Sequence, residues 1–104
     1  DNPGRGDKLL EGTHTGAGGT INAFVKLEGP TLGILQRALL TGDFFVTPPR
    51  TIFDLEATLI GTRLEDVERT IRKFFAKASI DTLSVTADDF IASINDALAK
   101  RQGA

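Results

Sequence analysis

The sequence has 104 residues, of which 40% are hydrophobic and seven are phenylalanine, and its formal net charge is −2. This composition can build one core but lacks the positive excess of a nucleic-acid binder. Cysteine is absent, which excludes disulfides, iron–sulfur clusters, thiolate zinc sites and cysteine nucleophiles. No apolar run approaches the roughly 20 residues of a membrane-spanning helix, and no signal-peptide pattern is visible. We therefore expect a cytoplasmic protein without a membrane or nucleic-acid partner.

One folded domain is predicted, over residues 8–102. Residues 1–7 combine glycine, proline and charge without periodicity, a composition typical of a loose lead-in or linker. Residues 103–104 are predicted to be a tail. Between these ends no internal repeat or low-complexity segment divides the chain, so a single core is expected.

The first half of the chain has the pattern of β-strands. Thr20–Glu28 alternates between apolar and polar residues, as a strand with one buried face does. Its apolar members are Ile21, Ala23, Val25 and Leu27. Gly29-Pro30 predicts a turn, after which Thr31–Thr41 alternates again. The apolar members there are Leu32, Ile34, Ala38 and Leu40. We expect a hairpin, preceded by a short strand at Lys8–His14 and followed by a short strand or bend at Asp43–Val46.

The second half has the pattern of helices. Three threonines are each followed, three residues later, by an acid, which is the spacing of an N-terminal cap. These pairs are Thr51/Asp54, Thr62/Glu65 and Thr86/Asp89. The middle helix, Arg63–Lys77, is expected to place its apolar residues in one sector and two ion pairs, Glu65–Arg69 and Glu68–Arg72, opposite. The last helix is predicted at Ala87–Lys100. Strands followed by helices predict an α+β fold, with three helices packed on one face of a small antiparallel sheet of about three strands.

Two features of the first half could belong to a site. The glycine-rich loop Gly16–Gly19 connects two strands and lacks the lysine and the spacing of phosphate-binding loops. A tight turn is the simpler interpretation, and close backbone approach to a partner or ligand is the alternative. His14 is the only histidine, so it fits a zinc site poorly and has no identifiable nucleophile beside it. It is either a structural or surface residue or a contact between domains.

Two further segments could contact a partner. The adjacent residues Phe44 and Phe45 would point to opposite faces of a strand, so one can enter the core while the other stays exposed. Asp43, directly before them, can cap the turn through its side chain. On the middle helix, Arg69, Lys73 and Lys77 form a basic ridge, defined here by these three residues. Such a ridge is either a solvated face or a docking surface for an acidic partner.

The residues alone provide no catalytic apparatus. No nucleophile with its base, no metal cluster and no pair of carboxylates at a defined spacing can be assigned. The prediction from the residues is therefore an α+β module that binds another protein surface, with no catalytic residue and no metal ligand.

Three segments, in their order, resemble the C-terminal domain of lipoate–protein ligases. The first is Glu11-Gly12-Thr13-His14 followed by Gly18-Gly19, the second is Gly42-Asp43-Phe44-Phe45, and the third is Leu55-Glu56-Ala57-Thr58-Leu59-Ile60-Gly61 running into a helix. The resemblance covers about Leu9 to Leu98. It implies a topology similar to that of iron–sulfur scaffold proteins, whose cluster chemistry the missing cysteines argue against.

The resemblance implies an accessory role in an ATP-dependent enzyme. In this family a large domain binds lipoate and ATP, forms lipoyl-AMP and transfers the lipoyl group to a lysine of an acceptor domain. The small domain packs against the large one, in cis or as a separate subunit, and supports activation. The complete ligase would use ATP, Mg and lipoic acid, none of them bound by the small domain alone. The catalytic lysine belongs to the large domain and has no counterpart here.

The resemblance also implies a contact surface for the large domain. The residues assigned to it by this hypothesis are His14, Gly18, Gly19, Asp43, Phe44 and Phe45. Relatives often place basic residues just before the double glycine, where this chain has Thr15-Gly16-Ala17. A role for such a basic group toward an adenylate or a partner loop would be weakened or moved here. The alternatives are a non-enzymatic protein-interaction module derived from that domain, and a scaffold that binds a nucleotide.

Overall fold

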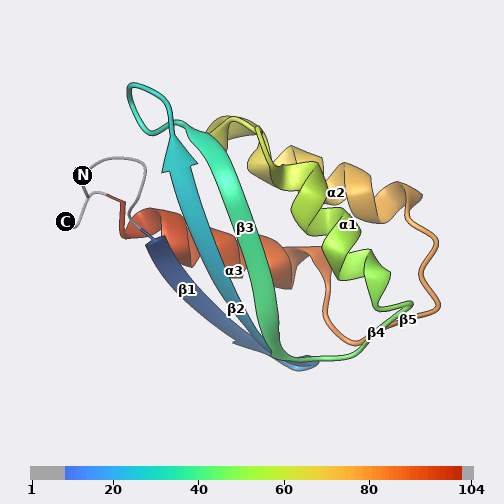
Figure 1. The fold of residues 1–104 in the computed structure, drawn as a ribbon. Helices are drawn as coiled ribbons and strands as arrows, with labels where there is room; N and C mark the ends of the chain where they lie inside the picture. Colours follow the sequence, from blue (N-terminus) through green and yellow to red (C-terminus); the bar gives the residue numbers. More distant parts are fainter. Residues whose placement is uncertain (1–8, 102–104) are drawn as a thin grey trace.

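The computed structural model describes residues 9–101, so the predicted lead-in at residues 1–7 and the tail at residues 103–104 lie outside the described residues. The described part contains a three-stranded antiparallel sheet in the order β1-β2-β3 and three α-helices (Figure 1). The strands are β1 (Leu9–Gly16), β2 (Gly19–Glu28) and β3 (Ile34–Asp43). The helices are α1 (Arg50–Leu59), α2 (Val67–Lys77) and α3 (Ala87–Ala99). The predicted α+β fold is confirmed.

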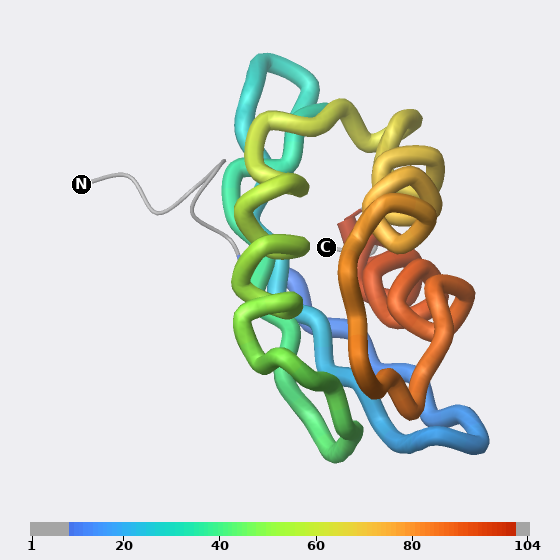
Figure 2. The backbone as a smooth tube through the Cα atoms, turned by 90° about the vertical axis from the view of Figure 1, so that its right-hand side faces the viewer, coloured from blue at the N-terminus to red at the C-terminus, as the bar shows by residue number. Residues whose placement is uncertain are grey.

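The helices pack on one face of the sheet and enclose a single core. Helix α3 packs on β1 and β2, α1 lies against β3, and α2 contacts both of these helices; in Figure 2, α1 lies to the left of α2 and α3. The predicted inward residues of β2 are all buried, at Ile21, Ala23, Val25 and Leu27. Within residues 9–101, no helix is long and apolar enough to cross a membrane.

The inward face of β3 differs from the predicted one. Leu32 lies in the turn before the strand, with a positive φ of 56°, and Leu35 is fully buried instead. The cause is a register shift beside Lys26 and Leu27, which adds one residue to β3. Because side chains alternate with a period of two, one extra residue moves the residues before it to the opposite face.

Only one of the three predicted threonine caps is present. The Thr86 hydroxyl accepts from the Asp89 backbone N–H at 3.2 Å, and the Asp89 carboxylate accepts from the Thr86 backbone N–H at 2.9 Å. At α1 the prediction is wrong, because the helix begins at Arg50 after Pro49 and Thr51 is buried inside it. Proline has the φ angle of a helix already fixed, which favours this earlier start.

The predicted cap at Thr62 is also wrong, because α2 does not begin after this residue. Gly61, with a φ of 85°, follows the end of α1, and the Thr62 carbonyl accepts from the Leu35 backbone N–H at 2.8 Å. A 3₁₀ turn, η1 (Leu64–Asp66), then precedes α2. Its tighter winding rotates Glu65 away from the α-helical i,i+4 row.

The ion pairs on α2 follow from this geometry. The predicted Glu68–Arg72 pair is present at 3.0 Å. The Glu65–Arg69 pair is wrong, because Arg69 pairs with Asp66 at 2.8 Å instead. These pairs are solvent-exposed and contribute at most about 1 kcal/mol each to stability.

A second, two-stranded sheet connects the two halves of the chain. Strand β4 (Val46–Thr47) pairs with β5 (Thr82–Leu83), which precedes α3. The prediction of a short strand or bend at Asp43–Val46 is therefore resolved into the end of β3, an irregular pair of phenylalanines, and the start of β4. This pairing places residue 84 beside residue 45.

Candidate functional site

The β1–β2 turn, the end of β3 and the segment entering α3 lie at one end of the molecule (Figure 1). We call this region the glycine end and define it by the six predicted contact residues together with Ser84 and Asp89. The sequence separates these residues by up to 75 positions, and the antiparallel topology brings them together.

The two glycines of this end are required by contacts within the chain. Ala17 and Gly18 form a two-residue hairpin loop between paired Gly16 and Gly19. A Cβ added to Gly18 would lie 1.6 Å from the Ser84 carbonyl oxygen, and one added to Gly19 would lie 1.9 Å from the Asp43 carbonyl oxygen. Gly19 also has a φ of 138°. The predicted tight turn is confirmed, and the close contacts that require these glycines are to Ser84 and Asp43 of this chain. The alternative, a close approach to a partner or ligand, stays a prediction.

Ser84 connects the glycine turn to Phe45. Its hydroxyl donates to the Gly18 carbonyl at 2.8 Å and accepts from the Phe45 backbone N–H at 2.9 Å. Its own N–H donates to the Phe45 carbonyl at 3.0 Å. The sequence does not point to Ser84, since a serine before a helix cap carries no signal that it contacts a turn 66 residues away.

The two adjacent phenylalanines point in different directions, as predicted. Phe44 is half-buried and packs edge-on against Phe90, with ring centroids 5.6 Å apart, and Phe90 stacks on Phe75. Phe45 is 73% exposed. Because both backbone polar groups of Phe45 are bonded to Ser84, its exposed ring is presented from a fixed backbone.

His14 lies on the helical side of β1 and contacts α3. Its Nε2 is 3.0 Å from the Asp89 carboxylate. The pKa of Asp89 lies below its ordinary value of 3.8, mainly because the Thr86 backbone N–H donates to it; partial burial opposes this shift, and the side chains of His14 and Thr86 add to it. His14 thus packs against the capping box of α3. Whether it also contacts a partner stays a prediction.

Asp43 ends β3 on the face of the sheet that the helices leave open. It pairs with Thr20 of β2 and its side chain is exposed. Within residues 9–101, no group of three or more His, Asp or Glu side chains is arranged to hold a metal ion. The chemistry that this end offers is contact chemistry: an exposed aromatic ring, a carboxylate beside it and a rigid backbone beneath both.

Comparisons with known proteins place this fold in one biochemical context. No protein-family model matches the sequence, and no curated protein matches it. A solved structure from Thermoplasma acidophilum is similar, with a TM-score of 0.74 and 26% sequence identity over 84% of this chain and 94% of that one. It comes from an archaeal lipoylation system, a bi-partite lipoate protein ligase and its E2 lipoyl domain. The chain therefore has the fold of a component of a lipoylation system.

Proposed function

We propose that this chain is the accessory domain or subunit of an ATP-dependent lipoate–protein ligase and supports the activation of lipoate to lipoyl-AMP. The observation that carries the proposal is the similarity of nearly the whole fold to a chain from a bi-partite ligase system. The three ordered segments that resemble the small ligase domain lie on β1 and the β1–β2 turn, at the end of β3, and on α1 and the two residues after it.

The glycine end is the proposed contact with the large catalytic domain. Aromatic side chains held on a rigid backbone are the anchors that dominate protein interfaces, and Phe45 fits this description. Asp43 lies two residues away and can supply a polar contact at the rim. Gly18 and Gly19 act by allowing the backbone to close beneath Phe45, and Phe44 acts by packing in the core.

The proposed support of activation is a population shift in the large domain. Lipoate, ATP and Mg would be bound there, and lipoyl transfer to the acceptor would take place there. A chain that adds no reacting group can raise the rate only by binding the activation-competent state more tightly than the inactive one. A preference of about tenfold corresponds to about 1.4 kcal/mol of differential contact energy, which one aromatic anchor can provide.

Reconstitution tests the proposal. The full chain is mixed with the large part of a bi-partite ligase, and lipoyl-AMP formation is followed by exchange of labelled pyrophosphate into ATP. We expect little exchange with either component alone and exchange that rises with the amount of this chain. Absence of both binding and stimulation contradicts the proposal. Binding without stimulation selects the alternative, an interaction module derived from the accessory domain.

A further inference from the structure

The basic ridge of α2 is only partly neutralised within the molecule. Arg69 forms an ion pair with Asp66 at 2.8 Å. Within residues 9–101, neither Lys73 nor Lys77 has a carboxylate within 4.0 Å. They are separated by one helical turn and therefore lie on the same side of α2. Among the described residues these two adjacent cations have no carboxylate partner, so they remain for interactions with other groups.

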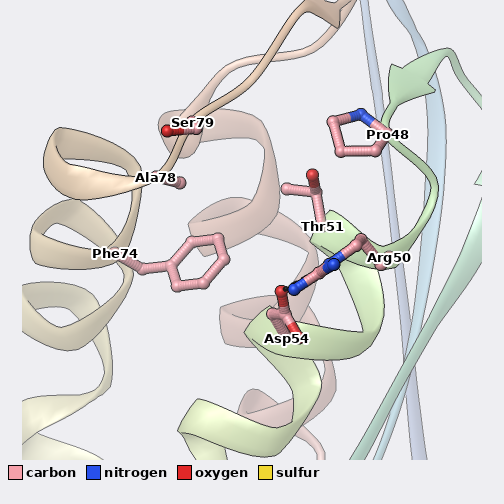
Figure 3. Close-up of a pocket in the computed structure, with 7 residues that line it drawn as sticks. All are labelled: Pro48, Arg50, Thr51, Asp54, Phe74, Ala78 and Ser79. Carbon is pink, nitrogen blue, oxygen red and sulfur yellow. Dashed lines mark ion pairs between the residues drawn. The ribbon is translucent and has the colours of Figure 1, made fainter.

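These lysines border a groove between α1 and α2. Two adjoining pockets of about 440 Å³ and 380 Å³ share Phe74 and Ala78. Lys73 and Lys77 line the second pocket together with Thr58 and Thr70. Figure 3 shows the first pocket, with the Phe74 ring directed from α2 toward Thr51 of α1. The two residues shared by the pockets, Phe74 and Ala78, are apolar, and the groove is also lined by residues with hydroxyl groups, which are Thr51, Thr58, Thr70 and Ser79.

The charge of the groove is opposite in sign to that of the whole protein. Its charged lining residues are Arg50, Asp54, Lys73 and Lys77. Arg50 and Asp54 are 3.7 Å apart and partly neutralise each other, so the lysines leave a local positive excess in a chain of net charge −2. This local positive excess attracts an acidic ligand to the groove although the protein as a whole carries a net negative charge.

We propose that the α1–α2 groove docks an acidic helical segment of a partner protein. Carboxylates spaced at i,i+4 on that segment would face Lys73 and Lys77, and an apolar side chain between them would cover Phe74 and Ala78. From Arg50 to Thr58 the groove follows α1 for about 12 Å at 1.5 Å per residue, which matches about two turns of a docked helix. This site is separate from the glycine end and does not rest on the proposed function.

The test uses the full chain labelled with ¹⁵N and two synthetic peptides of about 16 residues, long enough to form helices. One peptide carries glutamates at i,i+4 with leucines beside them, and the other has lysines in place of the glutamates. We expect the acidic peptide to shift the amide signals of Thr51, Phe74 and Ala78, and the basic peptide to leave them unchanged. Added salt should weaken the binding, because exposed charges are screened over about 10 Å at 0.1 M.

Matched variants locate the binding. The double substitution Lys73→Glu and Lys77→Glu should weaken binding at least about tenfold, and Lys73→Gln with Lys77→Gln should weaken it less. The control, Lys26→Glu with Arg37→Glu, changes two cross-strand cations on the open face of the sheet and should keep the affinity within about twofold. Equal binding by the Lys73/Lys77 variants, shifts centred on Phe45, or competition by inorganic phosphate at the same amides would overturn the proposal.

Discussion

The glycine end and the α1–α2 groove use their distinctive residues in opposite ways. At the glycine end, most of the residues noted in the sequence make contacts within the chain. Gly18 lies against the backbone of Ser84, Phe44 packs against Phe90, and His14 contacts Asp89. Phe45 is the large side chain that stays exposed there. In the groove, Lys73 and Lys77 lack an internal partner among the described residues. The residues that are conspicuous in the sequence are therefore mostly required by the fold. The residues free to bind a partner are those that make no contacts within the chain.

The largest expected loss of stability comes from a substitution in the glycine turn of the glycine end. Gly18→Ala should lower the free energy of unfolding by about 3 kcal/mol or more, because the new Cβ meets the backbone of Ser84 and the chain must shift. The comparison variant is Gly61→Ala, where the positive φ of 85° is unfavourable for alanine but nothing lies within 4 Å of the added Cβ; a loss of about 1 kcal/mol is expected from the backbone conformation alone. Urea denaturation of both variants measures the difference. Equal losses would mean that close approach is not what requires Gly18.

The two phenylalanines separate folding from contact. Phe44→Ala should lower the free energy of unfolding by about 2 kcal/mol or more, since the edge-on contact with Phe90 and part of the core are lost. Phe45→Ala should change it by less than about 0.5 kcal/mol, because the ring is exposed. Thermal and urea unfolding give both values. A large loss with Phe45→Ala would show that the ring is structural and would remove it as the partner anchor.

Substitutions of Thr86 and Thr62 test which threonine caps a helix, and they are expected to change stability less than the glycine and phenylalanine variants. Thr86→Ala should lower the free energy of unfolding by about 1 kcal/mol, because one half of the capping box of α3 is removed. Thr62→Ala should cost less than about 0.5 kcal/mol, since Thr62 caps no helix and its hydroxyl bond to Thr58 is long, at 3.4 Å. Urea midpoints compare them directly. A similar loss for both variants would contradict the observed helix starts.

The smallest expected effect is a pH dependence at the start of α3. The folded pKa of Asp89 lies below its ordinary value of 3.8, so its ionised form stabilises the fold above that pH, and this contribution is lost as the pH falls through the folded pKa. Asp89→Asn should therefore flatten the fall in stability in this acidic range. Unfolding free energies measured at a series of acidic pH values test the shift. If the unfolding free energy of Asp89→Asn falls with decreasing pH as steeply as that of the unaltered protein, Asp89 is not the source of this pH dependence.

Much of the fold could be predicted, because it follows from local periodicity. The strand β2, the helix α3 and the Thr86 cap are all determined by residues near one another in sequence. The start of α1 was missed because the fixed φ of proline outweighed a threonine cap, and the inward face of β3 was missed because a bulge has no apolar signature. The capping at Thr62 failed because a tertiary bond to Leu35 fixes that residue.

The candidate site was less predictable, since its contacts join distant parts of the chain. The sequence predicts that one ring of the Phe44–Phe45 pair can enter the core while the other stays exposed. The structure confirms this, with a half-buried Phe44 packed against the core and an exposed Phe45. The His14–Asp89 contact depends on how α3 packs on β1, and the contacts of Ser84 depend on the pairing of β4 with β5. The partner role of the six predicted residues stays a prediction, and resemblance to the small ligase domain is what gives those residues a proposed partner.

The central claim is most directly tested by the rate of lipoyl-AMP formation by the large part of a bi-partite ligase, measured at increasing concentrations of this chain. We predict saturating stimulation by the unaltered chain and by Phe53→Ala, which removes another exposed phenylalanine, 67% accessible on α1. Phe45→Ala should need at least about tenfold more protein for half-maximal stimulation. A flat response to all three, or identical curves for the unaltered chain and Phe45→Ala, would contradict the account.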